Sequence, residues 1–213
     1  MKKKYIIVIV DDHKLFRDGI ELLLNQFDFI DTVYQVSDGN EYLKLLSIIT
    51  PDIVLMDINM PGLDGVKTTK KSKKINPNIK IVALTMHDNA NYYNKMINAG
   101  ADGFITKDTA SDELKLALLK IINKECYISQ KVLENVIKNL NKSEEDNEIV
   151  FSKREEEVLF HLAQGASTQE IAEKLYISTR TVERHKENMY IKTNCKNAVC
   201  LIMFAVKQKL IAV

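Results

Sequence analysis

Four short apolar runs in this chain each end in a polar side chain that could do chemistry. The polar residues are the pair Asp11 and Asp12, then Asp57, Thr85 and Lys107, which follow the runs 5–10, 53–56, 79–84 and 103–106. Three carboxylates in one place raise one another's pKa values unless a cation lies among them. Carboxylates suit Mg²⁺, which binds one or two of them together with a phosphate. Because aspartate can attack phosphorus and lysine can offset the charge on the transferring oxygens, these residue types predict phosphoryl transfer to Asp57.

The apolar runs must lie on neighbouring strands for these side chains to meet. Each run is four to six residues long and rich in β-branched residues, which is typical of a buried parallel strand, and helical periodicity fills the segments between them. The carboxyl ends of parallel strands in an open α/β sheet face one crevice, so the polar residues are expected to converge there. One aspartate after a strand is most often a helix N-cap, and one lysine is most often a surface group. Four polar strand ends in one regular series favour a site instead.

Five short motifs extend this pattern. They are Val10-Asp-Asp-His13, the segment 55–65 (LMDINMPGLDG), Ala83-Leu-Thr85, the segment 100–104 (GADGF) and Thr106-Lys-Asp108. Through these motifs, residues 4–124 resemble the receiver domain of bacterial response regulators. The resemblance implies an α/β fold, a doubly wound (βα)5 flavodoxin-like domain. It also implies that Asp57 accepts a phosphoryl group from a phosphohistidine on a sensor histidine kinase.

The same resemblance gives roles to the other polar residues. Mg²⁺ would be held directly or through water by four groups. These are the carboxylates of Asp11, Asp12 and Asp57 and the backbone carbonyl of Asn59. Lys107 would pair with the phosphoryl oxygens, and the hydroxyl of Thr85 would move to bond one of them. Phe104 would be the switch aromatic that turns inward when the threonine moves. A local charge change would thus be coupled to a surface with two states, as in other phosphorylation switches.

The C-terminal part of the chain is expected to contain four helices and no strand. Ser152-Lys-Arg-Glu155 is a capping box that opens the first helix, and Gly165 ends it. Thr168 is expected to cap a second helix that ends at Leu175, and Ser178 a third from Thr179 to about Ile191. The last helix is predicted over 196–208. Two helices joined by so short a turn predict a helix-turn-helix, whose second helix can enter the major groove of DNA.

Residues 151–211 resemble the LuxR-type helix-turn-helix domain of NarL/FixJ response regulators. The matching residues include Glu170-Ile-Ala172, Ile177-Ser178, Thr181-Val182 and His185. The resemblance implies a recognition helix whose residues at or near double-stranded DNA are Thr179, Thr181, Val182, Glu183, Arg184, Lys186 and Glu187. Many relatives carry basic residues at the positions of the two glutamates, although glutamate can accept a hydrogen bond from cytosine N4. His185 is expected to support the helix by packing.

These patterns predict a division of the chain into three segments. We expect a receiver domain over 1–125, a linker with a short helix over 126–150, and an all-α DNA-binding domain over 151–213. Apolar residues at helical spacing predict an amphipathic helix over 129–140, too short for a coiled coil, so it is expected to pack within the molecule. The segment 139–148 is polar and acidic, as is typical of an exposed linker.

Composition places the chain in an ordinary class. The 213 residues are 46% hydrophobic and 28% charged, enough for two cores. Residues 151–213 carry ten basic and seven acidic side chains, a weak excess that agrees with phosphate-backbone binding. The first apolar run is too short for a signal peptide or membrane span, so we expect a cytoplasmic protein without a membrane partner. The three cysteines are expected to be reduced thiols that bind no zinc.

Three functional hypotheses follow. The first is a two-component transcriptional regulator that dimerises when phosphorylated and is not an enzyme beyond its own phosphoryl transfer and dephosphorylation. The second is an aspartate-nucleophile phosphatase of the haloacid dehalogenase kind. That class needs a second aspartate two residues after the nucleophile, where this chain has Asn59. The third is a DNA-binding protein whose receiver works without phosphorylation, which the complete set of polar residues disfavours.

Overall fold

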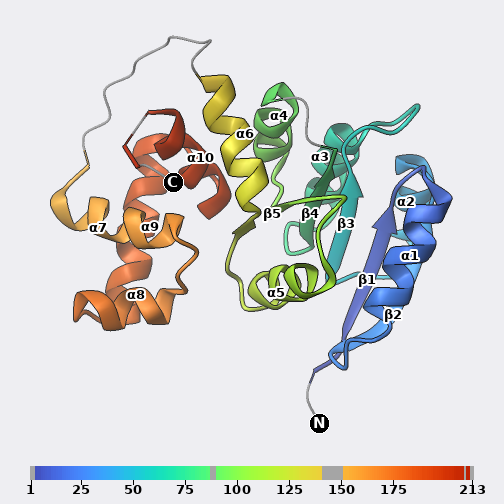
Figure 1. The fold of residues 1–213 in the computed structure, drawn as a ribbon, viewed down its shortest axis with the longest axis horizontal. Helices are drawn as coiled ribbons and strands as arrows, with labels where there is room; N and C mark the ends of the chain where they lie inside the picture. Colours follow the sequence, from blue (N-terminus) through green and yellow to red (C-terminus); the bar gives the residue numbers. More distant parts are fainter. Residues whose placement is uncertain (1–2, 87–89, 141–150, 209, 212–213) are drawn as a thin grey trace.

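The computed structural model describes residues 3–86, 90–140, 151–208 and 210–211. An all-parallel sheet forms its centre, with the strand order β2-β1-β3-β4-β5-β6 (Figure 1). The strands are β1 (Tyr5–Val10), β2 (Ile30–Val36), β3 (Ile53–Asp57), β4 (Lys80–Thr85), β5 (Gly103–Thr106) and β6 (Tyr127–Ile128). The predicted α/β doubly wound receiver fold is therefore confirmed, and the sheet gains a sixth strand that the sequence patterns do not reveal.

Both faces of the sheet are covered by helices. In the first 140 residues these are α1 (Lys14–Leu24), α2 (Gly39–Leu45), α3 (Gly65–Ile75), α4 (Ala90–Ala99), α5 (Ser111–Ile122) and α6 (Gln130–Leu140). Alternate residues of one strand point to opposite faces, so Ile7 and Ile9 pack with α1 and α5. Val8 and Val10 pack in the core on the other side, with α2, α3, α4 and α6. Because both faces of the sheet are buried, the strands are continuous apolar runs in the sequence.

The C-terminal part is all helical, as predicted. Its helices are α7 (Lys153–Ala163), α8 (Thr168–Leu175), α9 (Thr179–Thr193) and α10 (Ala198–Lys207). The capping box of Ser152 and Glu155 and the cap from Ser178 are confirmed. The second cap is corrected by one residue, because Ser167 rather than Thr168 accepts a hydrogen bond from Glu170 N and forms its own capping box. No helix among the described residues is long and apolar enough to cross a membrane.

Helix α6 joins the two parts of the molecule. Val132 and Leu133 are buried in the same core as α4 on one side and α10 on the other (Figure 1). The amphipathic helix predicted over 129–140 thus packs within the molecule, and β6 just before it pairs with β5 at the edge of the sheet. The last part of the expected linker, 141–150, lies outside the described residues.

Helix α10 is buried on nearly all sides. Val199, Ile202 and Val206 are buried at helical spacing, and Leu201, Met203 and Ala205 are buried as well. The reason is that α10 packs against α7 and α9 of its own bundle and against α4 and α6 of the receiver. A hydrogen bond from Asn197 Nδ2 to the carbonyl of Ala101, 2.8 Å long, adds a polar contact between the two parts.

Candidate functional site

A lysine and two aspartates meet at the carboxyl end of the sheet. The Nζ atom of Lys107 lies 2.6 Å from Asp11 Oδ2 and 2.9 Å from Asp57 Oδ2. All three side chains are buried, with Lys107 only 5% exposed. They come from loops or strand ends of β1, β3 and β5, so the structure brings together residues that stand up to 96 positions apart in the sequence. In this low-dielectric setting an ion pair is far stronger than at the surface.

Local backbone geometry places Asp57 at this point. It is the last residue of β3, which lies between β1 and β4 in the sheet. Helix α3 starts close behind it at Gly65, where the Cβ atom of any larger residue would stand 2.0 Å from the carbonyl oxygen of Asp57. Only glycine allows this approach. The loop after Asp57 therefore turns sharply and leaves the carboxylate facing the crevice.

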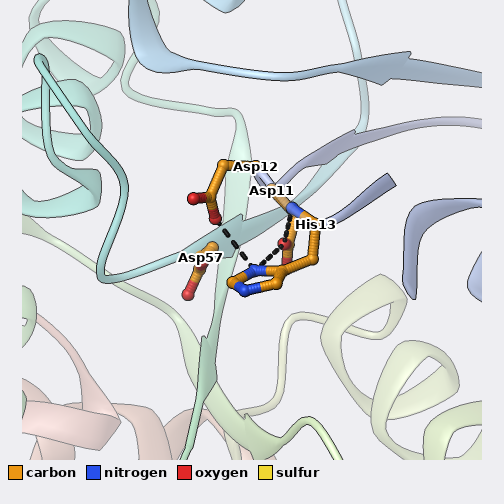
Figure 2. A group of neighbouring side chains, drawn as sticks. All are labelled: Asp11, Asp12, His13 and Asp57. Carbon is orange, nitrogen blue, oxygen red and sulfur yellow. Dashed lines mark hydrogen bonds and ion pairs between the residues drawn. The ribbon is translucent and has the colours of Figure 1, made fainter. Parts of the chain in front are cut away.

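Asp12 and His13 complete the rim of the site. The Nδ1 atom of His13 lies 3.0 Å from Asp12 Oδ1 and 3.2 Å from Asp11 Oδ1 (Figure 2). One ligand atom from each of Asp11, Asp12, His13 and Asp57 lies within 4.8 Å of the others. Asp11 and Asp57 are buried, whereas Asp12 and His13 are exposed, so the cluster opens to solvent on one side.

Burial and charge change the acidity of the central pair. Burial raises the pKa of Asp57 above its usual value, and the charge of Asp11 adds to this, while the hydrogen bond from Lys107 opposes it. For Lys107, burial works against the charged form, but its bonds to Asp11 and Asp57 outweigh burial and raise its pKa. The lysine therefore stays charged at neutral pH, and the carboxylate that faces it is more basic than an exposed aspartate.

The donor set fits a hard divalent cation. The carboxylates of Asp11, Asp12 and Asp57 supply oxygen ligands, and they lie close enough to share one ion. Asn59, whose carbonyl the resemblance adds to this set, follows closely in the chain, and its backbone N–H faces Asp57 Oδ1 at 3.4 Å.

The two expected switch residues lie on neighbouring strands. Thr85 is the last residue of β4, and its carbonyl accepts a hydrogen bond from the backbone N–H of Lys107. Phe104 on β5 is fully buried and packs edge-on against Tyr93 of α4, with 5.7 Å between ring centroids. The aromatic ring is thus already inward in this structure, between the sheet and α4.

Most of the residues expected at DNA lie on exposed parts of α9. Thr179, Glu183, Arg184 and Glu187 are exposed, and Thr181 and Lys186 are half-buried. Thr181 serves the start of the helix, since its backbone N–H donates to Ser178 Oγ. The expectation for Val182 is wrong, because its side chain has no exposed surface and packs in the core of the helical bundle. Val182 therefore holds α9 in place instead of facing a groove.

The side chain of Glu183 is hydrogen-bonded to neighbouring residues of its own domain. Its carboxylate accepts hydrogen bonds from Thr168 Oγ1 at 2.7 Å and from Lys186 Nζ at 2.9 Å. These two bonds and the charge of Lys186 together hold the pKa of Glu183 below its usual range, although burial works in the opposite direction. The glutamate that departs from the family pattern is thus neutralised by a neighbouring lysine on the same helix.

One flank of α9 lies against the receiver. Thr179, Glu183 and Lys186 line a cleft of about 560 Å³ whose other wall includes the turn 123–126 between α5 and β6. Beside this cleft, Lys120 Nζ of α5 donates a hydrogen bond of 2.5 Å to the carbonyl of Gly165, between α7 and α8. A major groove about 12 Å wide must enclose a recognition helix that is itself about 10–12 Å across. This cleft therefore lies beside the flank of α9 that carries Thr179, Glu183 and Lys186.

No function was assigned from the sequence to two residues at the receiver site. They are His13, which belongs to the first motif, and Arg17. Arg17 Nη1 donates to the backbone carbonyl of Asp11 at 2.5 Å, which fixes the turn after β1. A helix starting at Lys14 puts position 17 one turn later on the same side, so helical periodicity could have indicated Arg17.

Comparison with known proteins agrees with this architecture. Residues 7–119 match the family model for the response regulator receiver domain, and residues 149–205 match that for bacterial regulatory proteins of the luxR family. The chain therefore belongs to the response regulators of the NarL/FixJ type, the two-component transcription regulators that join these two domains. The chain is 33% identical to the oxygen regulatory protein NreC of Staphylococcus epidermidis over 96% of its length and 98% of that protein.

Two solved structures extend the comparison to three dimensions. The response regulator ChrA of a heme-sensing two-component system is 30% identical, with a TM-score of 0.55 over 99% of this chain and all of that one. The RcsB response regulator of Salmonella typhimurium, described in terms of its conformational dynamism for DNA interaction, is 25% identical. Its TM-score is 0.62 over 95% of this chain and 98% of that one.

Proposed function

We propose that Asp57 accepts a phosphoryl group from a phosphohistidine of a sensor histidine kinase and that this event controls DNA binding by α9. The observation that carries the proposal is the ion pair of Lys107 with Asp11 and Asp57 in a buried crevice at the carboxyl end of the sheet. The carboxylate that would react is buried, faces the crevice and has a raised pKa. The extent of the receiver at 1–125 and of the DNA-binding domain at 151–213 is part of the same proposal.

The chain's own residues can perform the transfer. An oxygen of Asp57 would attack the phosphorus, so that an O–P bond forms while the N–P bond of the phosphohistidine breaks. Lys107, only 2.9 Å from that carboxylate, would then pair with a phosphoryl oxygen, and Thr85 at the end of the next strand would donate its hydroxyl to another. Mg²⁺ held by Asp11, Asp12, Asp57 and the carbonyl of Asn59 would offset the added negative charge.

The proposal is tested by the intact mass of the protein after incubation with Mg²⁺ and acetyl phosphate. We expect one phosphoryl adduct in the parent protein and none in Asp57→Ala. Asp64→Asn is the matched control, because Asp64 also lies in the loop after β3 but caps α3 through a bond to Lys67 N that asparagine can replace. An adduct that survives in Asp57→Ala would rule out this assignment.

Transcription control would follow from DNA binding by paired copies. We propose that α9 enters the major groove and that Arg184, exposed in its first half, contacts a base edge or phosphate. Two copies on adjacent half-sites would place two such helices one helical turn of DNA apart. Light scattering of the phosphorylated and unphosphorylated protein would show whether the adduct shifts the protein toward a dimer.

The contacts between the two parts of the molecule support a coupling mechanism. Phe104 and Tyr93 connect the site to α4, and α4 packs against α10. A rearrangement of Thr85 and Phe104 would therefore reach the interface that holds α9 beside the receiver. We propose that phosphorylation loosens this interface and frees the recognition helix.

A further inference from the structure

We infer that Tyr176, in the turn between α8 and α9, donates a hydrogen bond from its hydroxyl to a phosphate of the DNA backbone and so helps to position the recognition helix. The inference rests on the proposed DNA binding by α9 and adds a contact residue that lies outside that helix. The tyrosine strains the backbone of the turn and contributes no packing to the fold, and a contact with DNA accounts for both observations.

The turn after α8 requires a left-handed backbone at position 176. Tyr176 has φ 54° and ψ 44°, and its backbone N–H donates to the carbonyl of Glu173 at 3.3 Å. The N–H of Ile177 donates to the carbonyl of Ala172 at 3.0 Å. These two bonds form a Schellman motif, in which the left-handed residue is usually glycine. A Cβ atom at this position crowds the neighbouring carbonyl oxygen, so tyrosine strains the turn and glycine would relieve the strain.

The tyrosine side chain does not offset this strain by packing. It is 95% exposed, more than any other large hydrophobic residue that the structure describes. Within the described part of the chain, no group bonds its hydroxyl and no ring stacks on its own. Strained residues of this kind cluster at functional contacts, where the side chain is needed for something other than folding. The receiver leaves this side chain open to a partner from solvent.

The position of the turn beside α9 indicates what that partner is. Ser178 caps α9 two residues after Tyr176. The N-terminal residues of a recognition helix approach the base edges of the major groove, so the turn before them passes the phosphates that border the groove. The unpaired N–H groups at the start of a helix also favour an anion. Lys174 and Arg180, on either side of the turn, are exposed and have no ion-pair partner among the residues described.

A phenol hydroxyl suits a phosphate chemically. It donates a hydrogen bond to an anionic oxygen, and tyrosine is one of the side chains that contact phosphates in protein–DNA complexes. Phosphate contacts fix the register and orientation of a protein on the duplex but carry no sequence information. The hydroxyl of Tyr176 should therefore contribute equally to the binding of a preferred site and of random DNA.

Opposite changes in stability and DNA affinity test this inference. Tyr176→Gly removes the ring and relieves the left-handed strain, so the midpoint of urea unfolding should rise while DNA affinity falls about tenfold. Tyr176→Phe keeps the ring and the backbone, and loss of the hydroxyl alone should lower the affinity about fivefold. Gel shifts at fixed salt measure the affinity of the full-length protein, after incubation with Mg²⁺ and acetyl phosphate, for a site selected from random sequences and for random DNA.

Asn194→Gly is the matched control. Asn194 has the same left-handed backbone, with φ 55°, and is exposed at the opposite end of α9. This variant should keep the DNA affinity of the parent protein.

Three other results would contradict the inference. Parent affinity in both Tyr176 variants, with weakened binding by Arg184→Ala, would overturn the role of Tyr176 and leave DNA binding by α9 standing. Weakened binding by Tyr176→Gly alone, with parent affinity in Tyr176→Phe, would overturn the hydrogen bond to phosphate. If the parent protein binds no DNA, both this inference and the proposed function are wrong.

Discussion

Asp11 and Asp57 lie at the ends of neighbouring strands with almost no exposed surface, whereas Glu183 and Glu187 project from α9 near solvent. The first two are held against a buried lysine, and Glu183 is held by a lysine on the same helix. Charges in a crevice interact at low effective dielectric, while pairs at the surface are weakened by water and salt. A change of charge at the receiver site should therefore have large effects, and one on α9 should act mainly through contacts with DNA.

The largest effect is expected from the buried lysine. Lys107→Met removes the ammonium group that faces Asp11 and Asp57, so a phosphoryl group on Asp57 loses its nearest cation. Loss of one such group typically lowers a rate by about 10²–10³-fold. The initial rate of adduct formation with acetyl phosphate, followed by intact mass, measures this loss.

Lys131→Met provides the control for that experiment. Lys131 also pairs with an aspartate, Asp108, but both side chains are at least half exposed. Exposed pairs contribute about 0–1 kcal/mol, so this variant should take up phosphoryl at nearly the parent rate. Equal rates for the two lysine variants would show that burial of Lys107 has no part in the reaction.

The receiver site could be predicted from sequence because strand order fixes it. The predicted runs 5–10 and 103–106 coincide with β1 and β5, and those of β3 and β4 differ by one residue. Loops that follow the carboxyl ends of neighbouring parallel strands border the same crevice, so polar residues there are brought close together. The two-residue strand β6 left no such signal, because Tyr127 and Ile128 alone show no periodicity, and only pairing with β5 makes them a strand.

Which side chains of α9 face outward depends on how the helix is rotated about its own axis. The ends of α9 were predicted well from Ser178 and the following periodicity, yet Val182 was placed on the DNA side. Adjacent helical residues point about 100° apart, so Val182 faces the core while Glu183 and Arg184 face outward. The extra buried residues of α10 could not be predicted either, because packing against α4 and α6 depends on how the two domains dock.

Substitutions at Val182 and Arg184 should separate packing from recognition. Val182→Ala leaves a cavity in the helical bundle and should cost about 2–3 kcal/mol of unfolding free energy. Arg184→Ala should change stability by less than about 0.5 kcal/mol but weaken binding to a DNA site selected from random sequences by about 1–3 kcal/mol. Urea unfolding followed by circular dichroism and gel shifts at fixed salt measure the two effects.

If the two variants show the opposite effects, the core face and the DNA face of α9 have been assigned the wrong way round. Loss of DNA binding by folded Val182→Ala, with full binding by Arg184→Ala, would mean that α9 turns about its axis when it meets DNA.

A smaller effect is expected where the receiver touches the DNA-binding domain. Lys120→Met removes the hydrogen bond to the carbonyl of Gly165 and should weaken the contact that keeps the flank of α9 beside the turn 123–126. DNA affinity of the unphosphorylated protein should then rise about fivefold to tenfold, in line with about 1–1.4 kcal/mol for one partly exposed bond. Lys115→Met, on an exposed side of the same helix, should leave affinity unchanged. Unchanged affinity in Lys120→Met would remove this bond from the control of α9.

The smallest effect concerns acid stability of the helical bundle. Glu155 is buried, which alone would raise its pKa, but bonds from Lys192 Nζ at 2.6 Å and Ser152 N at 2.7 Å hold the pKa below its usual range. A carboxylate with a lowered pKa in the folded state stabilises the protein above its unfolded pKa, about 4.3, and loses that contribution as the pH falls. Glu155→Gln should therefore reduce stability by about 0.5–1 kcal/mol at pH 7 and by less below pH 4. Urea unfolding of parent and variant at both pH values measures the difference. If the difference in unfolding free energy between parent and variant grows as the pH falls, Glu155 is not held in its charged form by Lys192 and Ser152.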